Sequence, residues 1–191
     1  MEGYKNKIYF LEQISHLIEL SEEAKMFVES KMIRKSFSKG EVFIKSGEVC
    51  KEFFFLTNGL VRAYFDHDNK HITTWVCTEN SLVTSVQGFF SQSPALENIQ
   101  CLEHCDFECF NYEDLNYAIA TFPEINIAYR RTIEEYYSNS EIRSYLARIP
   151  NAKDRYEFFI KITPPSLFDR IPKKYLASML NMRPETLTRI S

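Results

Sequence analysis

The last residues of the chain carry polar side chains at helical spacing. In the segment YLASMLNMRPETLTRIS, residues 175–191, Glu185, Thr188 and Arg189 fall three and four residues apart, which places them on one side of a helix. A guanidinium can pair with O6 and N7 of guanine, and a carboxylate can accept a hydrogen bond from N4 of cytosine. These three residues are therefore the candidate base-reading residues.

The surrounding sequence predicts two short helices that would hold this face outward. Asn181 marks a sharp turn, because asparagine tolerates a left-handed backbone, and Pro184 suits the first turn of the next helix. The apolar positions predicted to face inward are Leu176, Met179, Leu180, Leu187 and Ile190. This is the layout of a helix-turn-helix, whose second helix enters the major groove. An ordinary helical hairpin is the alternative.

Basic residues flank the predicted helix pair. Lys173, Lys174 and Arg183 suit contacts to phosphate groups, which position a protein on DNA without reading sequence. The charge of the whole chain supports this assignment: residues 1–129 hold 11 Lys and Arg against 19 Asp and Glu, whereas residues 130–191 hold 12 against 7. An acidic front and a basic back predict two modules, the second of which faces a polyanion.

The front of the chain predicts helices followed by a β domain. Residues 7–34 have helical periodicity, and Ser21 followed by two glutamates is typical of a helix N-cap. Residues 37–110 are rich in aromatic and β-branched residues, with glycine- and asparagine-containing breaks about every 8 to 12 residues, the rhythm of a compact sandwich or barrel.

A long helix is predicted to follow, opening at Pro123 and extending over residues 123–149. About 25 residues would span nearly 40 Å, which is longer than a small domain needs. We therefore expect part of its apolar stripe to meet the same helix of a second copy, although packing on its own β domain is the alternative. The candidate dimer residues are Ile125, Tyr129, Ile133, Tyr136 and Tyr137.

Nearly the whole chain resembles the Crp/Fnr family of bacterial transcription regulators. KGEVFIKSGEVCKEFFFLTNGLVRAYF is similar to the opening strands of that family's β-roll, and RPETLTRI to its reading-helix pattern. The resemblance implies an α+β fold: an N-terminal double-stranded β-helix, jelly-roll-like, flanked by helices over 1–122, a dimerisation helix over 123–149, and a DNA-binding helix-turn-helix domain over 150–191. By similarity Glu185 and Arg189 read bases and Thr186 contacts phosphate. Pro184 replaces a base-reading arginine, which leaves the operator undefined.

The resemblance also directs attention to an effector site. Cyclic-nucleotide sensors of this family hold the ligand with a Gly-Glu pair and an Arg-Ser pair, yet no arginine occurs here between Arg62 and Arg130. A buried phosphate would then lack a countercharge. We expect no response to cyclic AMP, and name Thr84, Ser85 and Asn98 as candidate residues for an unidentified small-molecule effector. RNA polymerase is a further candidate partner.

Other residue groups carry no predicted site. Cys101, Cys105 and Cys109 suit small buried side chains better than metal ligands, and His67 and His71 suit an exposed turn. We expect no cofactor, no metal, no enzyme activity, no membrane span and a cytoplasmic location. The alternative is a small-molecule-binding β-roll, or a cupin-like enzyme, with no role on DNA.

Overall fold

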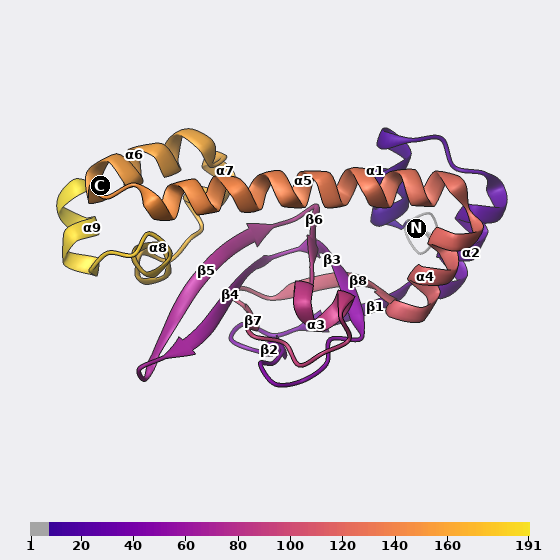
Figure 1. The fold of residues 1–191 in the computed structure, drawn as a ribbon, viewed down its shortest axis with the longest axis horizontal. Helices are drawn as coiled ribbons and strands as arrows, with labels where there is room; N and C mark the ends of the chain where they lie inside the picture. The colour runs from indigo at the N-terminus through magenta and orange to yellow at the C-terminus, as the bar shows by residue number, and fades with distance from the viewer. Residues whose placement is uncertain (1–7) are drawn as a thin grey trace, which may run out of the picture.

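The computed structural model describes residues 8–191 and is built around two four-stranded antiparallel sheets (Figure 1). The predicted helix start at residue 7 lies outside this range. The strands are β1 (Ile33–Phe37), β2 (Val42–Ile44), β3 (Glu52–Asn58), β4 (Leu60–His67), β5 (Lys70–Thr78), β6 (Ser81–Val83), β7 (Asn98–Cys101) and β8 (Cys105–Asn111). The predicted β-rich region is thus confirmed as a β-roll.

The two sheets enclose an aromatic interior. One sheet has the order β1-β8-β3-β6 and the other β2-β7-β4-β5. Four phenylalanine rings contributed by strands of both sheets pack together with centroid separations of 4.9 to 6.3 Å. These rings are Phe37, Phe43, Phe54 and Phe107. Aromatic rings at these separations prefer tilted and edge-on contacts, so they fill the roll with a specific packing.

The three cysteines of the 101–109 stretch belong to this interior. Cys101, Cys105 and Cys109 are fully buried, and burial raises the pKa of the Cys109 thiol to about 12. A thiol that is protonated and shielded from water is chemically inert. No group of three or more potential metal ligands is found within residues 8–191.

Nine helices in the described part of the chain flank the roll. They are α1 (Tyr9–Leu17), α2 (Glu22–Lys31), α3 (Val86–Phe90), α4 (Tyr112–Thr121), α5 (Pro123–Arg148), α6 (Ala152–Ile162), α7 (Pro165–Phe168), α8 (Lys173–Met179) and α9 (Pro184–Ile190). None of those described is both long and apolar enough to cross a membrane.

Long-range caps tie the N-terminal helices to the rest. Ser21 caps α2, as the sequence predicts, and its hydroxyl also donates to Glu124 at the start of α5 (2.5 Å). Helix α1 has no capping side chain of its own. Instead the buried carboxylate of Glu108 on β8 accepts the backbone N–H groups of Tyr9 (3.1 Å) and Phe10 (2.8 Å). A carboxylate at a helix N-terminus satisfies free N–H groups and complements the helix dipole.

Helix α5 links the two ends of the molecule. It passes along the roll from the N-terminal helices at one end to α6, α8 and α9 at the other (Figure 1). A second, separate apolar core forms at that far end, with contributions from α5, α6, α8 and α9. Its fully or nearly buried members are Leu146, Tyr156, Phe159, Ile171, Leu176, Ala177, Leu180 and Leu187.

Gly59, in the tight turn between β3 and β4, is a position where a side chain cannot be added. Its φ is +113°, and a Cβ atom would lie 2.5 Å from Cys105 Sγ and 2.6 Å from the His104 carbonyl oxygen. We expect Gly59→Ala to lower the free energy of unfolding by about 3 kcal/mol through strain and overpacking. Gly47 is the matched control: its φ is also positive, at +87°, but an added Cβ atom would have no neighbour within 4 Å. Gly47→Ala should therefore cost only about 1 kcal/mol. Urea unfolding of both variants measures the difference, and equal losses would contradict it.

Candidate functional site

The C-terminal helix pair, α8 and α9, is joined by a compact turn. Asn181 has a φ of +49°, as predicted, and the N–H of Met182 donates to the carbonyl of Ala177 (3.0 Å). This backbone bond across five residues ends α8 in the manner of a Schellman motif. Pro184 then opens α9, and Leu187 anchors α9 in the C-terminal core. The turn therefore fixes the angle between the two helices.

The outward face of α9 is polar and free of ion pairs. Glu185, Thr188 and Arg189 are exposed, and Thr186 is half-buried. Within the described chain no ion pair engages Glu185 or Arg189, whereas the Thr188 hydroxyl donates to the carbonyl of Pro184 (3.0 Å). The three residues predicted to read bases are thus brought together on one exposed helix edge.

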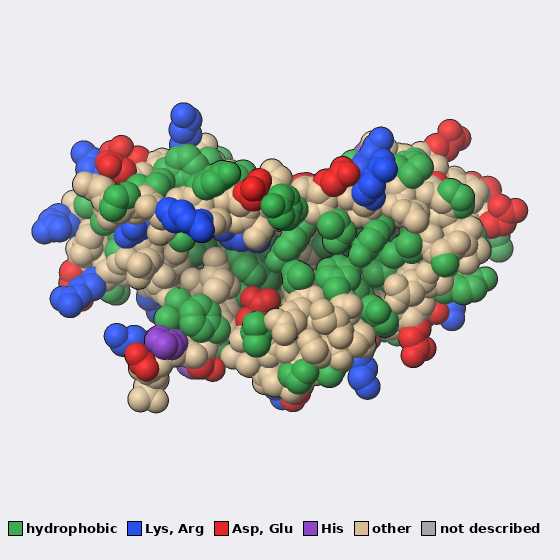
Figure 2. All heavy atoms as spheres, in the orientation of Figure 1, with side chains coloured by type: hydrophobic (Ala, Val, Ile, Leu, Met, Phe, Trp, Pro, Cys, Tyr) green, Lys and Arg blue, Asp and Glu red, His purple; other side chains and the backbone are tan. Residues whose placement is uncertain are grey.

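Lys173, Lys174 and Arg183 lie at the N-terminal ends of the two helices. Lys173 and Lys174 form the first turn of α8, and Arg183 is the N-cap of α9; all three are exposed. Cations at these positions oppose the helix dipole, so helix stability does not explain them. Figure 2 shows lysine and arginine side chains gathered around the end of the molecule that holds α6, α8 and α9. This end is an electropositive surface suited to a polyanion.

A cavity lies between helices α1 and α5 and the strands β3, β5 and β6. Its wider part has a volume of about 410 Å³ and its deeper, apolar part about 90 Å³. Both parts share Phe10, Ile14, Leu82, Thr84, Thr132 and Tyr136. The volume and the mixture of apolar walls with a few polar groups suit a small ligand.

The predicted effector residues are only partly brought together. Thr84 lines both parts of the cavity, and the adjacent Ser85 is buried as the N-cap of α3. Asn98 of β7 does not join them: it accepts from the Ser46 N–H (3.0 Å) and donates to Asp66 of β4 (3.3 Å). Asn98 therefore supports strand structure and does not line this cavity.

Arg143 of α5 is a cavity residue that the sequence reasoning missed. Its guanidinium lies 5.5 Å from the ring centroid of Tyr136, and it enters the wider part of the cavity. Burial raises the pKa of nearby Glu97, an effect opposed by a hydrogen bond from Trp75 and by the charge of Arg143. Arg143 belongs to the long helix and not to the roll sequence, and it follows Tyr136 by seven residues on the same helix face.

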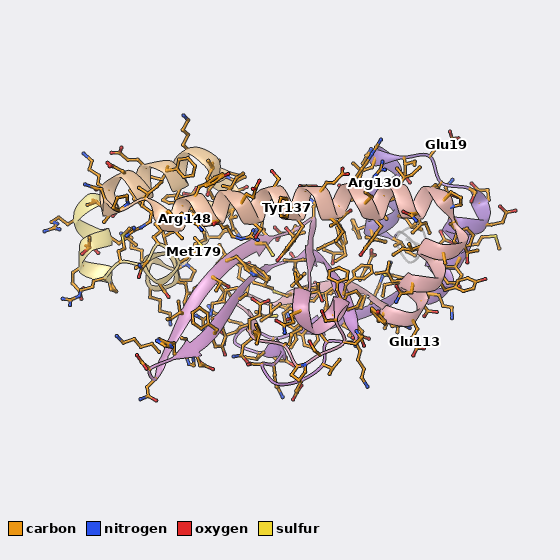
Figure 3. All side chains as sticks on the ribbon, viewed as in Figure 1. Glu19, Glu113, Arg130, Tyr137, Arg148 and Met179 are labelled. Carbon is orange, nitrogen blue, oxygen red and sulfur yellow. The ribbon has the colours of Figure 1, made fainter. Side chains whose placement is uncertain are left out.

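The predicted dimer residues divide between two environments. Ile125 is buried in the core of its own chain, and Tyr129 and Ile133 are half-buried against the cavity. Tyr136 and Tyr137 are exposed, and Figure 3 places Tyr137 near the middle of α5. The first part of the stripe therefore covers its own chain, which is the alternative that the sequence left open, and the later part remains uncovered.

Comparison with known proteins identifies the class of fold. Residues 34–122 match the family model of the cyclic nucleotide-binding domain. A search of curated protein sequences gave no significant match. The chain thus contains a β-roll of the cyclic nucleotide-binding type, in agreement with the two-sheet architecture described above.

Solved structures extend the likeness to the helices beyond the roll. FixK2 from Bradyrhizobium japonicum has a TM-score of 0.70 at 13% identity, over 83% of this chain and 82% of that chain. The c-di-GMP-responsive global regulator CLP from Xanthomonas campestris has a TM-score of 0.68 at 12% identity, over 89% of each. A CooA mutant from Carboxydothermus hydrogenoformans has a TM-score of 0.69 at 14% identity, over 93% and 80%. These matches are to regulators of the Crp/Fnr type, and at such identities they show a shared fold.

Proposed function

We propose that this protein is a homodimeric, sequence-specific DNA-binding transcription regulator of the Crp/Fnr type, located in the cytoplasm. In this proposal the sensor-like domain, which comprises the β-roll and the N-terminal helices, takes up residues 1–122, the dimerisation helix 123–149 and the helix-turn-helix domain 150–191. The observation that carries the proposal is the exposed edge of α9, where Glu185 and Arg189 project without ion-pair partners in the described chain. Unpaired charges on a helix anchored by its own core are poised for an external partner.

Each side chain of the C-terminal helix pair has a distinct role in this proposal. Arg189 pairs with a guanine and Glu185 with a cytosine, while the Thr188 methyl group contacts a thymine methyl, because its hydroxyl is bonded to Pro184. The phosphate-contacting residues are Lys173, Lys174, Arg183 and Thr186. They orient α9 in the major groove and contribute affinity that depends on salt.

Dimerisation through α5 supplies the second reading helix. Tyr137 and Tyr145 are 65% and 58% exposed, and hydrophobic side chains gather along and beneath α5 on the face shown in Figure 2. A contiguous apolar surface of this kind is typical of an interface. A two-fold dimer must present its two reading helices about 34 Å apart to meet successive major grooves.

The roll is proposed to serve an effector other than cyclic AMP, or to act as a scaffold. The segment from 63 to 129 offers no arginine, and four phenylalanine rings fill the space between the sheets. A cyclic phosphate held between the sheets would have no arginine from this segment beside it, and an unpaired charge is costly in a low-dielectric site. A small molecule in the cavity beneath α5 would act by favouring one arrangement of the reading helices. RNA polymerase is the expected partner of the DNA-bound regulator.

Selection from a random duplex pool followed by fluorescence anisotropy tests the proposal. We expect the full chain to enrich a two-fold symmetric site. Because each half of a dimer offers three flanking cations, the logarithm of affinity should fall against the logarithm of salt with a slope of about −5. Cyclic AMP should leave the dissociation constant unchanged. Enrichment of no sequence at any salt would instead favour the small-molecule-binding or cupin-like alternative, and binding only with cyclic AMP would overturn the effector argument.

A further inference from the structure

Arg170, which lies between α7 and α8, joins the C-terminal helices to two turns of the β-roll. Its guanidinium donates to Glu79 from Nη1 (2.7 Å) and Nη2 (3.0 Å), and to Glu103 from Nε (3.2 Å) and Nη2 (2.6 Å). A fifth bond runs from Nη1 to the Thr78 hydroxyl (2.7 Å). All five N–H groups of the arginine are thereby used, in the forked geometry that makes arginine–carboxylate pairs strong.

A hydrogen bond within the β-roll orients the carboxylate of Glu79 independently of Arg170. Glu79 also accepts the backbone N–H of Gly59 (2.7 Å), so its carboxylate is held in place by a neighbouring turn of the same domain. The hydrogen bonds from Arg170, more than the other contacts, lower the pKa of Glu79 to about 2. A carboxyl with a lowered pKa stabilises the contact fully above its ordinary pKa of 4.5 and loses that contribution only as the pH falls toward 2. The contact is therefore intact at neutral pH.

A second contact joins α8 to the outer face of the β2-β7-β4-β5 sheet. Arg62 of β4 is only 4% exposed, and its guanidinium is sandwiched between the rings of Tyr64 (4.3 Å) and Tyr175 of α8 (3.9 Å). It donates to Gln100 (2.9 Å) and Thr73 (3.2 Å), and no described carboxylate forms an ion pair with it. Burial lowers the pKa of Arg62, and the Tyr175 ring of α8 adds to the stabilisation that this buried cation receives from Tyr64 and its hydrogen bonds.

Helix α8 also makes a hydrogen bond to β5, the edge strand of that sheet. The N–H of Thr73 on β5, which lies at the edge of its sheet, donates to the hydroxyl of Ser178 on α8 (3.0 Å). An edge-strand N–H that would otherwise face solvent is satisfied by the C-terminal domain. Together with the contacts above, this fixes α8 on the β4–β5 hairpin, as Figure 1 shows, and leaves the outward edge of α9 unobstructed.

We infer that Arg170 and Tyr175 are positioning residues for DNA binding: they clamp the C-terminal helix pair to the β-roll so that α9 is held in one orientation before DNA arrives. The inference rests on the proposed function. A helix pair that is already oriented loses less conformational freedom when it binds DNA. In a dimer, two oriented helix pairs can engage both half-sites together. Both residues lie outside the exposed edge of α9, but the Tyr175 ring also lies 4.6 Å from Lys174 Nζ, a proposed phosphate contact. Arg170 has no such neighbour among its hydrogen-bond partners, so Arg170→Ala is the variant that tests orientation alone. A conformational change in the β-roll would also be transmitted to α9 through these contacts.

The test compares full-length variants on the selected duplex. Arg170→Ala and Tyr175→Ala should each weaken binding by roughly 10-fold or more, the usual size of coupling between sites, with the salt slope unchanged. Tyr175→Phe keeps the ring and should bind like the unaltered protein, and Arg170→Lys should recover part of the loss. Lys161→Ala is the matched control, because it removes one exposed charge from α6 without touching the clamp.

Two further measurements make the outcomes distinguishable. Circular dichroism during urea unfolding establishes that each variant is folded, and hydrogen exchange at the Thr73 N–H reports whether α8 remains docked. If Arg170→Ala is folded and undocked yet binds DNA as tightly as the unaltered protein, or more tightly, the clamp does not position α9 for DNA. If the unaltered protein binds no DNA, the proposed function fails first and the positioning role falls with it, whatever the exchange experiment shows about docking.

Discussion

Replacing Arg189 by alanine is expected to weaken sequence-specific binding strongly while leaving the protein folded. The side chain is exposed and makes no ion pair within residues 8–191, so its removal costs the fold little. A bidentate arginine–guanine pair contributes about 1–3 kcal/mol of discrimination, and a two-fold dimer loses it twice, so the total is about 2–6 kcal/mol. At 1.4 kcal/mol for each factor of ten, affinity for the selected site should fall by at least about 30-fold.

Arg189→Lys separates charge from geometry at the same position. Lysine keeps the positive charge but cannot present the planar fork of arginine. The salt slope of Arg189→Lys should therefore match that of the unaltered protein, while preference for guanine at the contacted base weakens. Lys173→Ala is the opposite case: it should weaken binding to all sequences uniformly and reduce the magnitude of the slope. Repeating the selection with Arg189→Ala decides the matter, since an unchanged consensus would show that Arg189 does not read a base.

Features that depend on local chemistry could be predicted from the sequence. Ser21 caps α2, Pro123 opens α5, and Asn181 takes a left-handed backbone, each as its residue type favours. The antiparallel β-roll follows from strand-forming residues separated by turn residues at regular intervals. In each case a few neighbouring residues are enough to predict the local structure, because the interaction that decides it lies within one turn or one hairpin.

Features that depend on contacts between distant segments could not be predicted in this way. Alternation along β4 assigns Arg62 to the outer face of its sheet, but nothing nearby in sequence shows that Tyr175 covers it. The partners of Arg170 lie 91 and 67 residues away, and the cap of α1 comes from Glu108. Likewise, the sequence around Asn98 does not show that its side chain bonds to Ser46 and Asp66. Chain topology, rather than spacing, decides which polar groups meet.

A charge placed at Tyr137 should separate the dimer and with it the affinity for a two-fold site. Tyr137 lies near the middle of α5 and is 65% exposed, so a glutamate is accommodated in a monomer without disturbing a core (Figure 3). In a dimer the same glutamate would be desolvated against its symmetry-related copy, where like charges repel and neither has a partner. We expect Tyr137→Glu to sediment as a monomer.

Loss of the dimer converts two linked contacts with DNA into two independent ones. Linked binding exceeds the affinity of either module by about 10²–10⁴-fold, so Tyr137→Glu should lose at least about 100-fold on the two-fold site and much less on an isolated half-site. Tyr117→Glu is the matched control, because Tyr117 is similarly exposed, at 55%, but belongs to α4. Sedimentation equilibrium and anisotropy on both duplexes measure the two effects. A Tyr137→Glu protein that remains dimeric would remove α5 from the interface, whereas a monomer with undiminished affinity would show that a single α9 accounts for recognition.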